Sequence, residues 1–120
     1  MKTFTVILLK MAFLTALSGQ PKVNVYYFHT KTRCVTCRAV EAEARKNIEK
    51  LFGDEVQFTA VNLDEEDGEA IGKEMGVNSL RLLVVKGDRK FDLTNQGFMY
   101  ARLDPPKFRQ IMKENIEPLL

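Results

Sequence analysis

The sequence predicts an α/β fold with three layers, α/β/α, around a central mixed sheet of about four strands. Short apolar runs alternate with segments of helical periodicity, in the order β, α, β, α, β, β, α. The chain of 120 residues is long enough for one domain with a single core. Its composition, 45% apolar and 28% charged, is typical of a globular protein.

The only two cysteines of the chain lie where the predicted first strand and its loop lead into the predicted first helix. Residues 23–28 ("VNVYYF") are β-branched and aromatic, which predicts a buried strand, and the polar loop "HTKTR" follows. From Cys34 onward the apolar residues recur at helical spacing as far as Leu51, and Gly53 is expected to end this helix. The apolar stripe consists of Cys37, Val40, Ala44, Ile48 and Leu51. Cys34 is therefore expected at or just before the helix N-terminus, and Cys37 on the buried face.

The second half of the chain supplies three more strands and two more helices. Residues 56–63 read as a strand, the segment "DEEDGE" as an acidic loop, and residues 69–75 as a short helix closed by Gly76. "LRLLVV" and "KFDLTN" are predicted to be strands joined by the turn "KGDR". Asp104 is expected to cap a final helix that has Pro105 at its first position. The apolar face of that helix consists of Phe108, Ile111, Met112, Ile116 and Leu119.

Residues 1–19 have the pattern of a signal peptide, which leaves residues 20–120 as the domain. Lys2 precedes an apolar stretch, the small-x-small tripeptide 16–18 follows, and the polar break "SGQPK" comes next. The stretch is shorter than the ~20 residues of a membrane-spanning helix, so we expect no membrane span in the mature protein. We expect export to the periplasm. Because Lys10 interrupts the stretch, a first strand or helix of a cytoplasmic protein is the alternative reading.

The charge balance excludes one class of partner. Removing residues 1–19 takes away Lys2 and Lys10, and leaves 16 basic and 16 acidic side chains. A chain with this balance lacks the basic surface that binds nucleic acid, so we expect no nucleic-acid partner.

The segment "RCVTCR" predicts redox chemistry. A thiolate at a helix N-terminus is stabilised by the helix dipole and by free N–H groups, so Cys34 is expected to be the attacking nucleophile. Cys37, one turn further into the helix, is expected to be the buried resolving thiol. Supporting roles fall to neighbouring side chains that add positive potential or set the loop between the thiols. These are His29, Lys31, Arg33 and Thr36.

Two other readings of the cysteine pair remain open at this stage. It could be half of a zinc site, for which the chain offers only His29 besides acidic side chains as further ligands. It could also be a static disulfide, although so small a ring constrains little of the unfolded chain. We expect no metal and no cofactor other than the redox-active disulfide.

Two stretches resemble the thioredoxin-like superfamily. "YYFHTKTRCVTCRAVEAEARK" is similar to the active-site strand and helix of these proteins, and "VNLDEEDGEAIGKEMGVNSLRLLVVKGDRK" to the stretch that runs on to their last hairpin. The similarity covers residues 22–117. More narrowly, the aromatic strand, His29 and R-C-x-T-C resemble the small family named nitrophenyl compound nitroreductase subunit ArsF. The resemblance implies a thioredoxin-like fold, thiol–disulfide oxidoreductase activity, a monomer, and protein thiols, disulfides or a partner redox enzyme as partners.

Two departures from the thioredoxin pattern point to a second function. Arg33 stands where thioredoxins carry tryptophan, and the chain has no tryptophan. The loop with Ser79, Leu80 and Arg81, the expected substrate loop, lacks the cis-proline of thioredoxins. A non-proline cis bond costs ~3 kcal/mol or more, so a trans loop is expected. The alternative function is therefore an accessory or binding subunit that keeps the fold and has little general reductase activity.

Overall fold

The computed structural model describes residues 23–120. The predicted signal peptide, residues 1–19, lies outside the described residues. Within the described part, no helix combines the length and the apolar character that crossing a bilayer requires.

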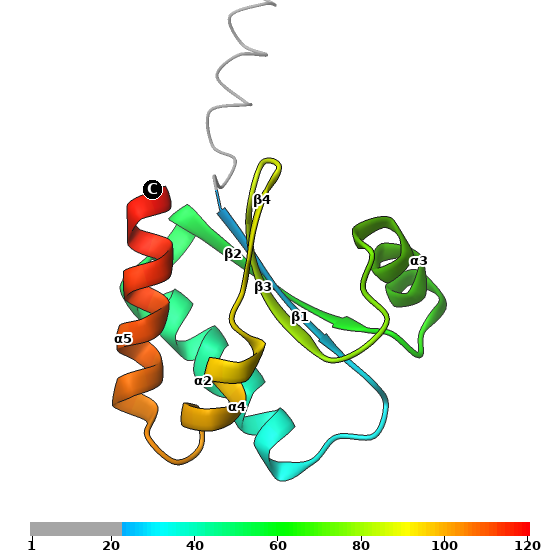
Figure 1. The fold of residues 1–120 in the computed structure, drawn as a ribbon, viewed down its shortest axis with the longest axis horizontal. Helices are drawn as coiled ribbons and strands as arrows, with labels where there is room; N and C mark the ends of the chain where they lie inside the picture. Colours follow the sequence, from blue (N-terminus) through cyan, green and yellow to red (C-terminus); the bar gives the residue numbers. More distant parts are fainter. Residues whose placement is uncertain (1–22) are drawn as a thin grey trace, which may run out of the picture.

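The elements follow the predicted order, with one additional helix. They are β1 Val23–His29, α2 Val35–Leu51, β2 Val56–Asn62, α3 Glu66–Met75, β3 Arg81–Lys86, β4 Arg89–Asp92, α4 Thr94–Tyr100 and α5 Pro105–Ile116 (Figure 1). Short 3₁₀ turns follow α2 (η1, Gly53–Glu55) and α5 (η2, Glu117–Leu119). Asp104 caps α5 as predicted, because its carboxylate accepts the backbone N–H of Lys107.

The four strands form one mixed sheet in the order β2-β1-β3-β4. β1 and β2 are parallel, joined by the α2 crossover, whereas β3 runs antiparallel to both β1 and β4. Helices α2, α4 and α5 cover one face of the sheet and α3 covers the other (Figure 1). The predicted three-layer α/β/α architecture with four strands is confirmed.

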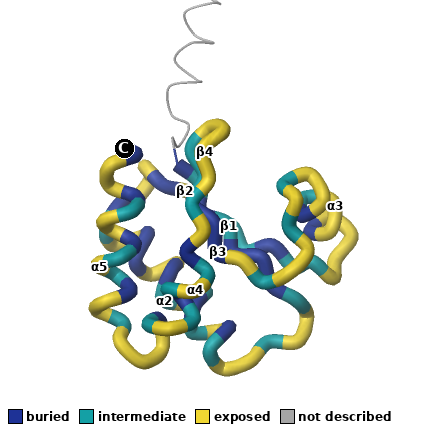
Figure 2. The backbone as a smooth tube through the Cα atoms, in the orientation of Figure 1, coloured by how far each residue is buried: buried dark blue, intermediate teal, exposed yellow. Residues whose placement is uncertain are grey.

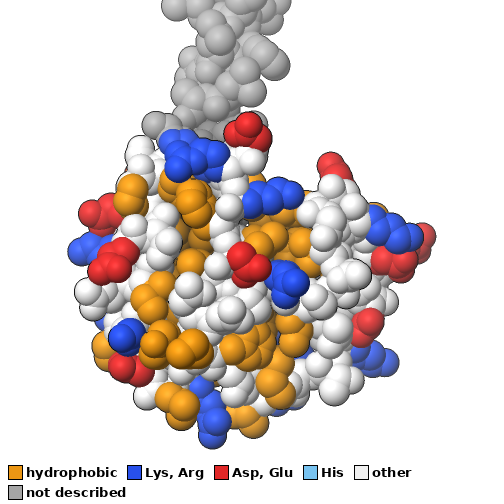
Figure 3. Space-filling view, in the orientation of Figure 1, with side chains coloured by type: hydrophobic (Ala, Val, Ile, Leu, Met, Phe, Trp, Pro, Cys, Tyr) orange, Lys and Arg blue, Asp and Glu red, His pale blue; other side chains and the backbone are white. Residues whose placement is uncertain are grey.

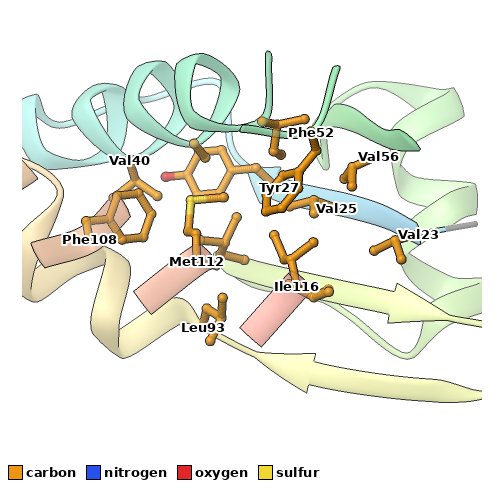
Figure 4. Packing of buried hydrophobic residues seen from close by; sticks show 14 of the residues in the cluster. Val23, Val25, Tyr27, Val40, Phe52, Val56, Leu93, Phe108, Met112 and Ile116 are labelled. Atoms are coloured by element: carbon orange, nitrogen blue, oxygen red, sulfur yellow. The ribbon is translucent and has the colours of Figure 1, made fainter. Parts of the chain in front are cut away.

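The larger core lies between the sheet and α2, α4 and α5. Alternate residues of β1, namely Val23, Val25 and Tyr27, point into it (Figure 4) and are fully buried. Strand β1 is mainly buried along its length (Figure 2). Val40 of α2 and Phe108 of α5 pack against this layer. Phe28, which follows Tyr27 and points to the other face of β1, joins a smaller cluster under α3. Because β1 is buried on both faces, its position is strongly constrained, and it leads directly to the cysteines.

The predicted strand over "KFDLTN" is only partly correct. β4 ends at Asp92, and Thr94 begins a helix, α4, that the sequence analysis did not predict. The Asp92 carboxylate accepts the backbone N–H of Thr94 at 2.9 Å, and the Leu93 N–H donates to the Leu82 carbonyl at 2.8 Å. The Leu93 bond continues the pairing of β3 and β4 by one residue, and the bond between Thr94 and Asp92 lies where the chain turns into α4.

The predicted start of the second helix was also wrong by three residues, because α3 begins at Glu66 within the supposed acidic loop. Gly68 lies in its first turns and is buried. A Cβ at Gly68 would collide with the carbonyl oxygen of Asn62. This close backbone approach explains a glycine inside a helix. Gly76, in the left-handed conformation with φ 72°, ends α3 as predicted.

Candidate redox site

Cys34 and Cys37 form a disulfide at the start of α2, with their Cα atoms 5.0 Å apart. Cys34 is the N-cap residue, in an extended conformation, and its Sγ accepts the backbone N–H of Cys37 at 3.0 Å. Its carbonyl accepts the N–H of Arg38 at 3.1 Å, the first bond of the helix. The sulfur thus takes the place of the side-chain oxygen that usually caps a helix.

The two sulfur-bearing residues differ in exposure, as the helical periodicity predicted. Cys34 is exposed, whereas Cys37 is 4% exposed and lies on the same stripe as Val40 and Ala44. A large molecule can therefore approach the disulfide only from the side of Cys34.

Tyr27, on β1, forms a hydrogen bond with the backbone of the buried cysteine on α2. Its hydroxyl donates a hydrogen bond to the Cys37 carbonyl at 3.0 Å, and the whole residue is buried. Burial raises the pKa of Tyr27 to about 12, and the negative charge of Glu41 adds to this effect, while Arg33 opposes it. Tyr27 is therefore a neutral donor that links β1 to the first turn of α2.

A chain of polar contacts runs from His29 through Arg33 to Glu41. His29 is 3% exposed, its Nδ1 lies 3.0 Å from the Thr30 carbonyl, and its Nε2 lies 2.7 Å from the Arg33 guanidinium. With Nδ1 as donor to the carbonyl, Nε2 is the acceptor from Arg33. The other arm of the guanidinium binds Glu41 at 2.5 Å. The charge of Arg33 is therefore paired, and adds less positive potential at Cys34 than the sequence suggested.

The other predicted supporting residues lie around the same loop. Lys31 is exposed, and its backbone N–H donates to the Asp64 carboxylate at 2.7 Å, which ties the cysteine loop to the end of β2. Thr36 is half-buried in the first turn of α2.

The expected substrate loop lies beside the end of β1. Ser79 is exposed, Leu80 is half-buried, and Arg81 pairs across the sheet with Phe28, next to His29. The guanidinium of Arg81 lies 3.6 Å from the Asp92 carboxylate. No cis peptide bond occurs in residues 23–120, so this loop is trans, as expected.

Two side chains of the site were not recognised from the sequence. Tyr27 was placed only within the predicted buried strand 23–28, and Glu41 was not singled out. The Glu41 side chain is in fact 18% exposed. One signal was available, since Glu41 follows Cys37 by four residues and so shares its side of the helix.

Two cavities of the described residues are lined by no cysteine, and no group suited to a metal ion lies among these residues. Across residues 23–120, no three His, Cys, Asp or Glu side chains are grouped to hold a metal ion. A cavity of about 620 Å³ lies along α5 and is lined by residues such as Lys113 and Glu117. Another of about 380 Å³ lies between α3 and the sheet, next to Tyr26 and Met75. Neither cavity is lined by a cysteine.

Known structures share this fold at low sequence identity. Thioredoxin O2 from Arabidopsis thaliana, in its oxidised state, matches with a TM-score of 0.56 and 20% identity, covering 87% of this chain and 86% of its own. Chlamydomonas reinhardtii thioredoxin f2 matches with a TM-score of 0.53 and 20% identity, over 80% of this chain and 81% of its own. The Deadhead thioredoxin of Drosophila melanogaster matches with a TM-score of 0.54 and 16% identity, over 88% and 92%. No protein-family model and no curated protein matches the chain. The chain has a thioredoxin-like fold with a Cys-x-x-Cys disulfide at a helix N-terminus.

Proposed function

We propose that this protein is a thiol–disulfide oxidoreductase that cycles Cys34 and Cys37 between dithiol and disulfide. One observation supports it above all others: the pair combines an exposed sulfur at a helix N-cap with a buried sulfur one turn later. The Cys37 N–H that points to Cys34 Sγ would equally stabilise a Cys34 thiolate after reduction.

The proposed cycle uses two exchange steps. In the reduced protein, the Cys34 thiolate attacks one sulfur of a partner disulfide, and the partner's other sulfur leaves as a thiolate that takes a proton from water. Cys37 then loses its proton to water and attacks Cys34 Sγ. The bond between Cys34 and the partner breaks, and the second partner thiolate is released and protonated. The protein pair is oxidised by two electrons, and the partner disulfide is reduced to two thiols.

Insulin reduction by the protein with a dithiol reductant tests this proposal. Cys34→Ser should lower turnover to the rate of the reductant alone, because the exposed nucleophile is lost. When Cys37→Ser is reduced beforehand and mixed with insulin after removal of the reductant, it should instead accumulate a mixed disulfide between Cys34 and insulin, visible by mass spectrometry. Equal turnover by the Cys34→Ser variant and the unmodified protein would refute the proposal.

A second candidate function is an accessory subunit with little general reductase activity. The loop containing Leu80 and Arg81 favours it, because it lacks the proline of thioredoxins and Arg81 is engaged with Asp92. Purification from the native host distinguishes the two functions. An accessory subunit should bring down the same partner whether or not Cys34 and Cys37 are replaced, whereas an oxidoreductase should retain its partner through a disulfide in the Cys37→Ser form.

We also propose a partner redox enzyme and export to the periplasm. A thioredoxin f2 structure of similar fold was solved in a complex with ferredoxin:thioredoxin reductase, which supports the idea of a reductase partner. Export rests on the sequence of residues 1–19, and an intact mass from the native host that retains Met1 would refute it. Membership of the narrower ArsF family rests only on the residues around His29 and the cysteines.

A further inference from the structure

The two edges of the sheet differ in how well they are protected from pairing with another strand. β4, at one edge, has four residues, of which Arg89, Lys90 and Asp92 are charged. Charged side chains of both signs lie along this part of the surface (Figure 3). Short length and charge are common protections of an edge strand. β2, at the other edge, has seven residues and no charged side chain.

The backbone of β2 directs hydrogen-bonding groups away from the sheet. On the inner side, the Leu63 N–H donates to the His29 carbonyl of β1 at 2.8 Å. The N–H and C=O of one residue point to the same side of a strand and alternate between neighbours, so residues 57, 59 and 61 face β1. Phe58 and Ala60 therefore direct these groups outward, where no other strand of residues 23–120 lies. Both residues are only partly buried.

We propose that β2 pairs antiparallel with β2 of a second copy of this chain, around a two-fold axis at Thr59. In this register Phe58 of each copy exchanges both backbone hydrogen bonds with Ala60 of the other copy. The two four-stranded sheets then form one continuous sheet. The inference does not depend on the proposed function, and it departs from the monomer that the resemblance implies.

The side chains of β2 suit pairing with an identical strand. Like charges directly opposite each other destabilise a pair of strands, and β2 has none. Thr59 shares the α3 face of the sheet with Val61, and on the two-fold axis it lies opposite Thr59 of the other copy, where the two hydroxyls can form a hydrogen bond. On the opposite face, the large Phe58 meets the small Ala60. The guanidinium of Arg45 covers the Phe58 ring at 4.8 Å from its centre, so this aromatic side chain is already held in place.

Disulfide cross-linking tests the register. With Cys34 and Cys37 replaced by serine, Thr59→Cys places one thiol of each copy on the two-fold axis. Directly opposite residues of this kind have Cα atoms about 4.5 Å apart, which a disulfide can span. Mild oxidation should therefore give a covalent dimer on a non-reducing gel. Gln57→Cys is the matched control, because Gln57 is exposed on the same face but lies about 13 Å from its own copy in this register, and it should give no cross-link.

Sedimentation of the chain as its native host processes it tests the association itself. We expect a dimer at micromolar concentrations. Thr59→Lys should raise the dissociation constant about tenfold or more, equivalent to about 1.4 kcal/mol, because it places two cations opposite each other. Gln57→Lys, the matched control, should leave the dissociation constant unchanged. Salt should strengthen the dimer, because it screens Glu55 and Asp64, the acidic residues that flank β2 and come near one another across the interface.

A second substitution guards against loss of the fold. Ala60→Pro removes an outward N–H that the protein's own sheet does not use, so it should dissociate the dimer and leave the urea midpoint near that of the unmodified protein. A monomer at all concentrations would overturn the inference, and would mean that water, another partner or the residues before Val23 cover this edge. A dimer that survives both Thr59→Lys and Ala60→Pro, or that Thr59→Cys does not cross-link, would overturn it as well. Insulin turnover decides the proposed function separately, because neither substitution touches the cysteines.

Discussion

Replacing Tyr27 by phenylalanine should change the stability of the oxidised protein in a pH-dependent way. Near pH 8, Tyr27→Phe loses the hydrogen bond to the Cys37 carbonyl, 3.0 Å long and fully buried. The carbonyl keeps its place in α2, so the cost should be about 1 kcal/mol of unfolding free energy.

At higher pH the stability advantage of tyrosine over phenylalanine should disappear. The tyrosine ionises near its ordinary pKa of 10.0 in the unfolded chain, but only at about 12 in the folded protein. Between these values the unfolded state binds fewer protons, so the contribution of Tyr27 is complete below pH 10 and is lost as the pH rises toward 12. The loss amounts to about 1.4 kcal/mol by about pH 11. Phenylalanine cannot ionise, so the two proteins should reach similar stability near that pH.

Urea denaturation of the oxidised proteins at several pH values from about 8 to 11 measures this difference. Tyr26→Phe is the matched control, because Tyr26 is the neighbouring tyrosine on β1 but is half-buried on the other face of the sheet. A stability difference between wild type and Tyr27→Phe that stays constant with pH would contradict the burial and the hydrogen bond that we assign to Tyr27.

Two further substitutions test the contacts around the site and under α3. Glu41→Gln removes the carboxylate that pairs with Arg33, so alkylation of reduced Cys34 by iodoacetamide near neutral pH should become about twofold faster at low salt, and the gain should shrink at high salt. An unchanged rate would mean that the ion pair does not influence the thiol. Gly68→Ala should lower the unfolding free energy by about 2 kcal/mol or more, because the added methyl group collides with the Asn62 carbonyl. Wild-type stability in urea would refute the close approach.

The sequence alone determined the elements whose periodicity is local and strong. β1 was recognisable because a short β-branched and aromatic run can bury both faces of a strand, and α2 because its apolar residues recur over more than four turns. The asymmetry between exposed Cys34 and buried Cys37 followed from the same spacing. Asp104 with Pro105 marked the start of α5, since the capping chemistry depends only on neighbours along the chain.

Tertiary structure decided the rest, because it depends on residues that are distant in sequence. Gly68 in the first turn of α3 and Gly97 in α4 each weaken a helix by ~1 kcal/mol relative to alanine, so local propensity argued against the early start of α3 and against α4. Packing favours these glycines instead, because the helix backbones lie against Asn62 and Val40. The pairing of Arg33 with His29 and Glu41 depends on the path of the loop after β1, which no periodicity specifies. Sequence therefore identified the two sulfurs, whereas only the folded chain showed how the charged side chains beside them are paired.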